Sequence, residues 1–242
     1  MKGLTIDVGN TAIKLARFEN GNIKSFSREE SSDIINQIED KLTDDLDYVA
    51  LCSVKQSVID LVKQKLPQVT IVDHNDYDDM IDMYLGNPPV KGSFAELGSD
   101  IAIGCYGALA DGYKDVIVVD SGTATTVTAV VDKTIEAVYI YPGFRLSKMS
   151  LFGGAEALDG DYGLKIKTGR ASNTEACIDL AVYHGTNGAV KEIISQIETM
   201  YEREFKVFIT GGDTSDFYID AYRREDKLVN IGLDSYMRKR LK

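Results

Sequence analysis

The sequence Asp7-Val8-Gly9-Asn10-Thr11-Ala12-Ile13-Lys14 carries the most information about the fold. It places a carboxylate at the end of an apolar strand, residues 4–8, and a tight turn directly after that strand. Gly9 lets the backbone approach an anion, and Lys14 on the following strand can reach the same anion. We therefore expect these eight residues to form a phosphate-binding turn, with Asp7 holding Mg²⁺ directly or through water.

A second turn with the same layout, Asp120-Ser121-Gly122-Thr123-Ala124-Thr125-Thr126, follows a second apolar strand. Each turn stands at the front of three short strands, expected at 4–8, 12–18 and 22–26 in the first half and at 115–119, 124–131 and 134–140 in the second. One acid followed by a glycine turn is weak evidence, because both residues are common in turns. Two such turns at corresponding places are stronger evidence and indicate an ancient duplication.

The remaining pattern continues each half with helices and further strands. Helices are expected at 31–42, 54–66, 99–110, 143–157, 173–197 and 233–240, and strands at 48–52, 69–72 and 206–210. The polar stretch 73–97 is expected to be a loop. The strand at 206–210 ends in a third turn, Thr210-Gly211-Gly212-Asp213, which offers a glycine surface to a stacked nucleoside. This order predicts an α/β protein with mixed sheets flanked by helices, in two domains, 1–112 and 113–242.

Composition and charge exclude several classes of protein. Of the 242 residues, 44% are hydrophobic and 27% charged, which is ordinary for a globular protein. The net charge of −11 is spread along the chain and repels phosphate backbones, so we expect neither nucleic acid nor membranes as partners. We expect a cytoplasmic protein, because no apolar stretch could span a bilayer or serve as a leader. Cys52, Cys105 and Cys177 are expected to be buried free thiols.

The three turns together resemble those of the actin-like ATPase and sugar-kinase superfamily, whose domains have RNase H-like topology. More closely, the sequence resembles the type III pantothenate kinases, whose opening D-x-G-N-T-x-x-K is matched without a mismatch. The other matching segments are Asp120 to Thr126, Tyr141-Pro142-Gly143 with Arg145 and Leu146, Asn173-Thr174 with Glu175, and Thr210 to Asp213. The resemblance therefore spans nearly the whole chain.

This resemblance implies transfer of the γ-phosphoryl group of ATP to pantothenate, giving 4'-phosphopantothenate, the first step of coenzyme A biosynthesis. It implies ATP contacts along residues 7–14 and at Gly122, Thr123, Gly211 and Gly212. It implies that Asp120 holds a monovalent cation, K⁺ or NH₄⁺. It also implies a homodimer with a shared active site, in which Thr174 reaches pantothenate from the neighbouring subunit.

The general base falls in Gly98-Ser99-Asp100, where the family has G-x-D-R at the start of a helix. A carboxylate there can accept the proton of a primary hydroxyl as it attacks the γ-phosphoryl group. Alternatively, Asp100 only caps the helix, since Ser and Asp are favoured in a first helical turn. The two phosphate turns favour the base.

The sequence departs from the family at Ile101, where the family's arginine binds the substrate carboxylate. A carboxylate left without its cation in a closed pocket costs about 2 to 5 kcal/mol. We hypothesise that Lys91, in an unusually long preceding segment, supplies the charge and that Tyr84 is the pocket aromatic, although Lys91 could equally be a solvated loop lysine. Two other functions therefore stay open: a non-catalytic relative that binds nucleotide, and a kinase for another small hydroxyl compound.

Overall fold

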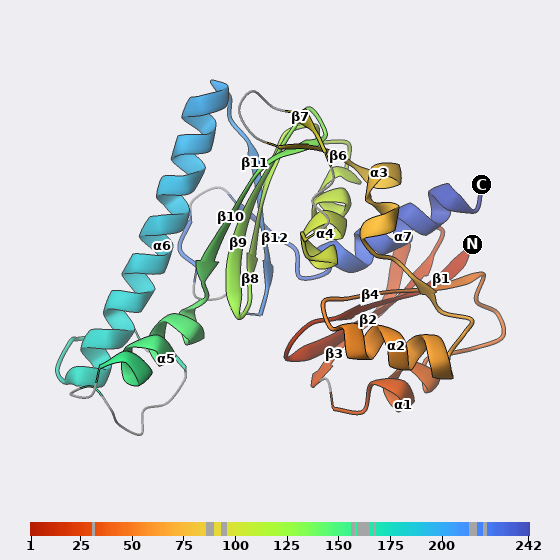
Figure 1. The fold of residues 1–242 in the computed structure, drawn as a ribbon, viewed down its shortest axis with the longest axis horizontal. Helices are drawn as coiled ribbons and strands as arrows, with labels where there is room; N and C mark the ends of the chain where they lie inside the picture. Colours follow the sequence, from red (N-terminus) through yellow and green to blue (C-terminus); the bar gives the residue numbers. More distant parts are fainter. Residues whose placement is uncertain are drawn as a thin grey trace. The chain divides into compact units, whose positions relative to one another are not determined.

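A computed structural model describes residues 1–30, 32–85, 90–92, 96–155, 158, 165–166, 168–212, 217–219 and 222–242 (Figure 1). The chain divides into two compact units, which we call unit 1 and unit 2. Unit 1 comprises Met1–Val116, Val130–Ala137 and Lys227–Lys242, and unit 2 comprises Ile117–Ala129 and Val138–Asp226. This division differs from the single boundary expected near residue 112, because the chain returns to unit 1 twice and ends there as a helix.

Unit 1 is built on a five-stranded sheet in the order β3-β2-β1-β4-β5. Its strands are β1 (Lys2–Val8), β2 (Ala12–Glu19), β3 (Asn22–Glu30), β4 (Tyr48–Ser53) and β5 (Thr70–Ile71). The first three form an antiparallel meander, and β4 and β5 add in parallel. Asn20 and Gly21, between β2 and β3, have φ of 52° and 83°, as a type I′ hairpin turn requires.

Alternation along β1 and β2 assigns the two faces of this sheet. Leu4, Ile6 and Val8 belong to a core with residues of α1 (Ile34–Glu39) and α2 (Gln56–Lys65). The other face receives α7 (Leu228–Arg240), which contacts β1, β2 and β4 and packs closely on α4 (Ser99–Leu109). Asp7 and Lys14 alternate with the core residues and so lie on the α7 side.

The second sheet has the order β12-β11-β8-β9-β10-β6-β7. Its principal strands are β8 (Val116–Ser121), β9 (Ala124–Val131), β10 (Thr134–Pro142), β11 (Lys206–Gly211) and β12 (Tyr222–Arg224). These five repeat the strand order of the first sheet. Asp132 and Lys133, between β9 and β10, have φ of 48° and 68°, so even the hairpin turn recurs. The predicted class, two RNase H-like sheets flanked by helices, is confirmed.

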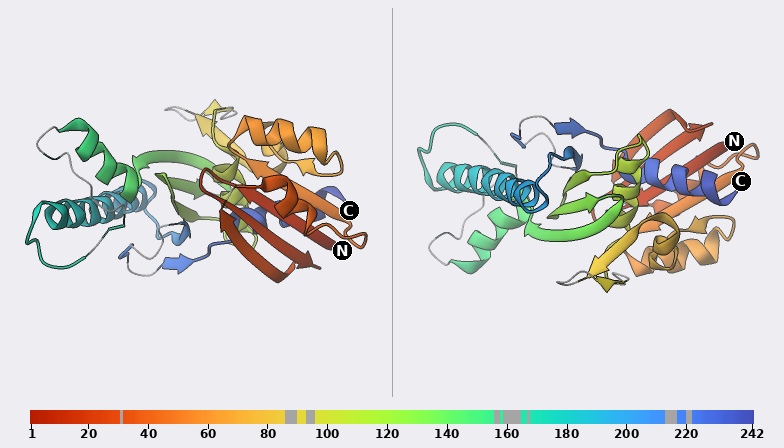
Figure 2. Two further views of the ribbon diagram at one scale, coloured as in Figure 1. Left: turned by 90° about the horizontal axis from the view of Figure 1, so that it is seen from below. Right: turned by 90° about the horizontal axis from the view of Figure 1, so that it is seen from above.

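Unit 2 also contains α5 (Phe144–Gly154) and the 28-residue α6 (Thr174–Tyr201), which lie against each other (Figures 1 and 2). Phe144 packs edge-on against Phe217, with ring centroids 5.1 Å apart. In the part of the chain that the structure describes, no helix is both long and apolar enough to cross a bilayer.

Several predictions of local structure were wrong. The stretch 73–97 is not simply a loop, since it contains a 3₁₀ turn (His74–Asp76), α3 (Tyr77–Met80), β6 (Asp82–Leu85) and β7 (Val90–Lys91). Although this stretch is rich in polar residues, four of its apolar side chains are buried: Tyr77, Met80, Ile81 and Met83. Cys177 is exposed rather than buried, because it lies on the outer face of α6. Residues 86–89, 93–95 and 213, which belong to the expected loop and third turn, fall outside the described residues.

Candidate active site

The first predicted phosphate turn joins β1 to β2 in unit 1. Gly9 N donates to the Ala12 carbonyl oxygen over 3.0 Å, and Asn10 and Thr11 at the tip are exposed. Directly below the turn, Asp7 and Lys14 are cross-strand partners. Lys14 Nζ lies 3.1 Å from Asp7 Oδ2, and the two side chains are only 12% and 7% exposed. A nearly buried ion pair thus lies beneath an open turn.

The thiol of Cys52 contacts the other oxygen of Asp7. Cys52 on β4 is the parallel partner of Asp7, and its Sγ lies 3.9 Å from Asp7 Oδ1. Burial raises the pKa of Cys52 well above its ordinary value, and the charges of Asp7 and Asp100 raise it further. The thiol therefore stays protonated and acts as a weak donor to Asp7. Sequence analysis identified the buried thiol but not this contact, although the carboxyl ends of neighbouring parallel strands necessarily meet.

The turn is also held by residues that sequence analysis missed. Ser53 Oγ donates to the Val8 carbonyl oxygen over 3.1 Å, and Lys55 Nζ donates to the Asn10 carbonyl oxygen over 2.8 Å. From α7, Asn230 Nδ2 lies 3.1 Å from the carbonyl oxygen of Thr5 and 3.3 Å from that of Lys14. These contacts come from segments distant in sequence, so only the fold reveals them.

Asp100 lies in the first turn of α4, whose N-cap is Gly98. Its Oδ1 accepts from the backbone N of the next residue, Ile101, over 2.9 Å, which is a first-turn contact of the kind that the alternative helix-end role predicts, although the N-cap position itself is Gly98. Ser99 Oγ donates to the Ser53 carbonyl oxygen over 3.3 Å and ties the start of α4 to the end of β4. Because this contact places the start of α4 against the end of β4, Asp100 lies near Cys52, and its charge contributes to the raised pKa of that thiol.

Tyr77 holds the segment that leads into α4. It is buried, and its hydroxyl donates to the Leu97 carbonyl oxygen over 3.0 Å. Burial raises the pKa of Tyr77 above its ordinary value, with further contributions from Cys52 and Asp100. This phenol therefore remains a neutral donor that fixes the approach to Asp100.

Tyr84 and Lys91, the predicted substrate contacts, face each other across the β6–β7 hairpin. Lys91 is 63% exposed, and its Nζ lies 2.5 Å from Asp82 Oδ1. The hydrogen bond to Asp82 raises the pKa of Lys91. Lys91 thus already has a carboxylate partner, with which a substrate carboxylate would have to compete.

In unit 2 the second and third predicted turns lie directly against each other. Gly122 N donates to the Ala124 carbonyl oxygen over 3.0 Å, as Gly9 does in unit 1, and Gly212 N donates to the Ser121 carbonyl oxygen over 2.6 Å. Gly211 has φ of 106°, and a Cβ there would overlap that carbonyl oxygen and lie 2.6 Å from Asp120 Oδ1. Only glycine fits this approach.

Gly143 and Thr174 stand at the N-terminal ends of α5 and α6 in unit 2. Gly143 N donates to the Thr123 carbonyl oxygen over 3.0 Å, which sets the start of α5 on the second turn. Thr174 is exposed at the first position of α6, where Asn173 Oδ1 accepts from Ala176 N over 2.9 Å as the N-cap. The cap presents Thr174 to solvent.

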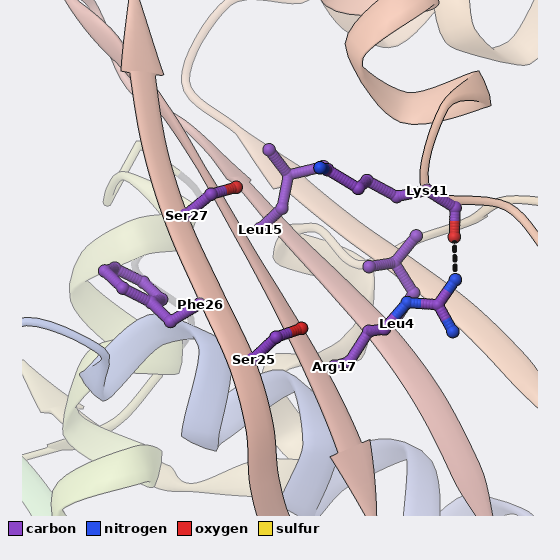
Figure 3. A pocket seen from close by; sticks show the side chains of 7 residues that line it. All are labelled: Leu4, Leu15, Arg17, Ser25, Phe26, Ser27 and Lys41. Atoms are coloured by element: carbon purple, nitrogen blue, oxygen red, sulfur yellow. Dashed lines mark hydrogen bonds between the residues drawn. The ribbon is translucent and has the colours of Figure 1, made fainter.

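A pocket of about 180 Å³ lies elsewhere in unit 1 (Figure 3). It is lined by Leu4, Leu15, Arg17, Ser25, Phe26, Ser27 and Lys41. Leu15 and Arg17 alternate with Lys14 along β2, so they point to the opposite face of the sheet. Arg17 donates through Nη2 to the Lys41 carbonyl oxygen. None of the predicted site residues lines this pocket.

Solved structures share the fold at low sequence identity. A Baf family protein from Campylobacter jejuni superposes with a TM-score of 0.62 at 15% identity, covering 98% of each chain. The activator of 2-hydroxyisocaproyl-CoA dehydratase from Clostridium difficile, solved with bound ADPNP, gives a TM-score of 0.57 at 11% identity and covers 100% of this chain and 97% of that one. At these identities the likeness establishes the fold alone.

Sequence relatives identify the family. The type III pantothenate kinase of Aquifex aeolicus is 25% identical over 218 residues, covering 90% of this chain and 89% of that protein. That of Thermosipho melanesiensis is 28% identical over 229 residues, covering 92% and 91%. The model of the type III pantothenate kinase family matches residues 3–196. The chain therefore belongs to the type III pantothenate kinase family, a family of phosphotransferases.

Proposed function

We propose that this protein transfers the γ-phosphoryl group of ATP to the primary hydroxyl of pantothenate, giving 4'-phosphopantothenate for coenzyme A biosynthesis. The observation that carries this proposal is the Asp7–Lys14 ion pair beneath an open glycine turn, with the first turn of α4, which contains Asp100, tied to the end of the neighbouring strand β4. A phosphoryl-transfer site needs an anion cradle, a cation and a base. In unit 1 the glycine turn, Lys14 and Asp100 are the proposed candidates for these three parts.

Each of these groups has a distinct task in the proposed reaction. Asp100 accepts the proton of the attacking hydroxyl, because its carboxylate is partly exposed in the first turn of α4. Lys14 offsets negative charge on the transferring group, and the backbone amides of the first turn bind the phosphate oxygens. Asp7 holds Lys14 in place through their ion pair, and it is the residue that would hold the Mg²⁺ that enters with ATP.

In unit 2 the proposed nucleotide contacts lie at the second and third turns. Gly122 and Thr123 would contact phosphate, and Gly211 and Gly212 would contact the nucleoside through bare backbone. Asp120 is the proposed ligand of K⁺ or NH₄⁺. The support is that an Asp120 carboxylate oxygen and the Ser121 carbonyl oxygen both approach the same point beside Gly211, and hard cations take oxygen ligands. The ion would neutralise charge beside the nucleotide.

We assign recognition of the substrate carboxylate to Lys91, with Tyr84 opposite it in the β6–β7 hairpin. Gly98, Ser99 and Ile101, which flank the proposed base Asp100, are the other proposed substrate contacts. The support is that Lys91 is an exposed ammonium group on the β6–β7 hairpin, where a substrate carboxylate would take the place of Asp82. We expect Lys91→Ala to raise the KM for pantothenate by about tenfold or more while leaving the KM for ATP unchanged. An unchanged KM for pantothenate would remove Lys91 from the site.

We further propose a homodimer with a shared active site, in which Thr174 contacts the substrate held by the partner. The exposed apolar side chains Ile140, Leu146 and Met149, near the start of α5, support an interface on unit 2.

The test of the function is ADP release in the presence of Mg²⁺ and K⁺, with and without pantothenate, and identification of the product by mass spectrometry. We expect pantothenate-dependent release that falls by about 10²- to 10⁴-fold in Asp100→Asn. ATP binding without turnover would instead indicate a nucleotide-binding accessory protein. Turnover with a different alcohol would indicate another substrate and would point to Ile101 as the reason.

A further inference from the structure

Unit 2 contains a fully buried ammonium group that has no part in the proposed phosphoryl transfer. Lys148, in the second turn of α5, is 0% exposed. Its Nζ lies 2.6 Å from Asp179 Oδ1 and 3.2 Å from Glu175 Oε1. Lysine is almost never fully buried unless it is paired. Both acids belong to α6, so this one side chain joins the two helices.

The two acids stand one turn apart on α6, at the i and i+4 positions. Like charges at this spacing repel each other and destabilise the helix. Asp179 is itself buried, so its charge has little water to screen it. Lys148 offsets both charges, and the conformation of the first two turns of α6 therefore depends on Lys148.

Those two turns begin with Thr174, next to Glu175. At its own N-terminal end, α5 is fixed to the second turn. The backbone N of Gly143, the N-cap of α5, donates to the Thr123 carbonyl oxygen over 3.0 Å. A Cβ at Gly143 would overlap the Gly122 carbonyl oxygen, so only glycine lets α5 start this close to the second turn. Direct contacts thus run from the Gly122–Thr123 turn through α5 and Lys148 to the first turn of α6.

An ion pair suits this task better than an apolar contact does. A buried ion pair adds little net stability compared with well-packed apolar residues of similar size, but it has a defined direction and partner. Apolar side chains allow two helices to slide by a fraction of a turn, whereas one ammonium between two carboxylates fixes a single register. We infer that Lys148 is a positioning residue that fixes the first turns of α6, and with them the orientation in which Thr174 meets the substrate of the partner subunit, an inference that rests on the proposed role of Thr174 toward pantothenate.

The test compares Lys148→Met, which keeps the length and removes the charge, with Lys148→Arg, which keeps the charge. The KM for pantothenate and the KM for ATP are measured separately, and Asp179→Asn serves as a second variant that weakens the same contact from the other side. We expect Lys148→Met to raise the KM for pantothenate by about tenfold or more, with the KM for ATP nearly unchanged and the effect largely rescued in Lys148→Arg. Equal KM values for pantothenate in wild type and folded Lys148→Met would overturn the inference, as would an equal loss for both substrates.

A second readout does not depend on activity. Hydrogen exchange at the backbone amides of residues 174–180 is expected to accelerate in Lys148→Met and in Asp179→Asn, while the C-terminal half of α6 keeps its protection. If wild type fails to phosphorylate pantothenate, the proposed function fails, and hydrogen exchange alone decides whether Lys148 orders the start of α6. Unchanged exchange in Asp179→Asn would refute the positioning role even if Lys148→Met did not fold.

Discussion

Lys14 has two electrostatic partners in the proposed mechanism, the Asp7 carboxylate and the phosphate groups of ATP. Asp7 is held from both sides, by Lys14 at Oδ2 and by the Cys52 thiol at Oδ1. Removing Lys14 would therefore leave a nearly buried carboxylate without its cation, in addition to removing positive charge from the phosphate site.

We expect Lys14→Met to lower kcat/KM for ATP by about 10²- to 10³-fold, because a preorganised charge at the transferring group is lost. We also expect the free energy of unfolding to fall by about 3 kcal/mol, measured by urea denaturation, because a buried pair is broken on one side. Lys24→Met is the matched control, since Lys24 forms an exposed pair with Glu19 over 3.2 Å. A similar loss of activity in both variants would contradict the assigned role.

The three thiols differ in exposure, so their reactivity toward a thiol reagent reports whether the surroundings of Asp7, which Cys52 contacts, are closed to solvent. Cys52 and Cys105 are buried and Cys177 is exposed, and burial raises the pKa of Cys52. A buried, protonated thiol reacts slowly because the thiolate is the nucleophile. We expect a disulfide reagent to titrate one thiol in the native protein and all three in denaturant, and none in native Cys177→Ser. Rapid native reaction of Cys52 would show that Asp7 lies in a more open site.

At the scale of elements, the packing of α4 against α7 determines where Asp100 stands. The two helices approach through glycines: a Cβ at Gly107 would overlap the Leu228 carbonyl oxygen, and one at Gly232 would overlap that of Ile103. Both contacts are with backbone, which cannot move aside as a flexible side chain can. The close packing of α4 on α7 therefore requires a residue without a Cβ at both positions.

Gly232→Ala is expected to destabilise the protein by about 1 to 3 kcal/mol through overpacking, and to lower kcat because α4 carries the base. Gly104→Ala is the control, since its Cβ would meet nothing nearer than Val229 Cγ2 at 3.7 Å. That variant is expected to be neutral or more stable by about 0.5 to 1 kcal/mol, because alanine favours a helix over glycine. Thermal unfolding and steady-state kinetics measure both effects. Equal behaviour of the two variants would contradict the close approach.

The helices and strands that have a clear pattern within their own residues were predicted from the sequence. Alternating apolar residues and turn residues predicted the two antiparallel meanders. The glycine turns pointed to Asp7 and Asp120, which lie near the ends of β1 and β8. The buried set of residues 73–97 was missed because each pattern is very short: Tyr77, Met80 and Ile81 have helical spacing over one turn only, and Ile81 and Met83 alternate over three residues only. Strand β12 has three residues and pairs with β11. Such short elements are stabilised by pairing rather than by sequence pattern.

Contacts between distant segments could not be predicted in the same way. Asn230 on α7 donates to Thr5 and Lys14, more than two hundred residues earlier in the chain. Tyr48 likewise donates through its hydroxyl to Asp234 Oδ1, a residue that also pairs with Arg238 over 2.8 Å. These pairs explain why the chain ends inside unit 1, a feature that a single boundary near residue 112 did not anticipate.

At the scale of the whole molecule, the proposed dimer has a physical rationale in the exposed apolar surface of unit 2. Ile140 is 71% exposed, Met149 50% and Leu146 40%, and Leu146 and Met149 are neighbours on one face of α5. We expect light scattering to report a dimer for the wild type and a monomer for Leu146→Glu/Met149→Glu. Met200→Glu is the control, because Met200 is 64% exposed at the other end of α6. A dimer in every variant would place the interface elsewhere.

A shared active site makes a stronger prediction than dimerisation does. Asp100→Asn removes the base and Thr174→Ala removes the proposed contact from the partner, so each homodimer should be nearly inactive with pantothenate at low concentration. If Thr174 acts across the interface, a mixed dimer contains one site with both residues intact. Mixing the two variants under conditions of subunit exchange should then restore up to about a quarter of wild-type activity, since half of the dimers are mixed and each has one working site. If both residues act within one chain, every site in the mixture lacks one of them, and mixing restores nothing.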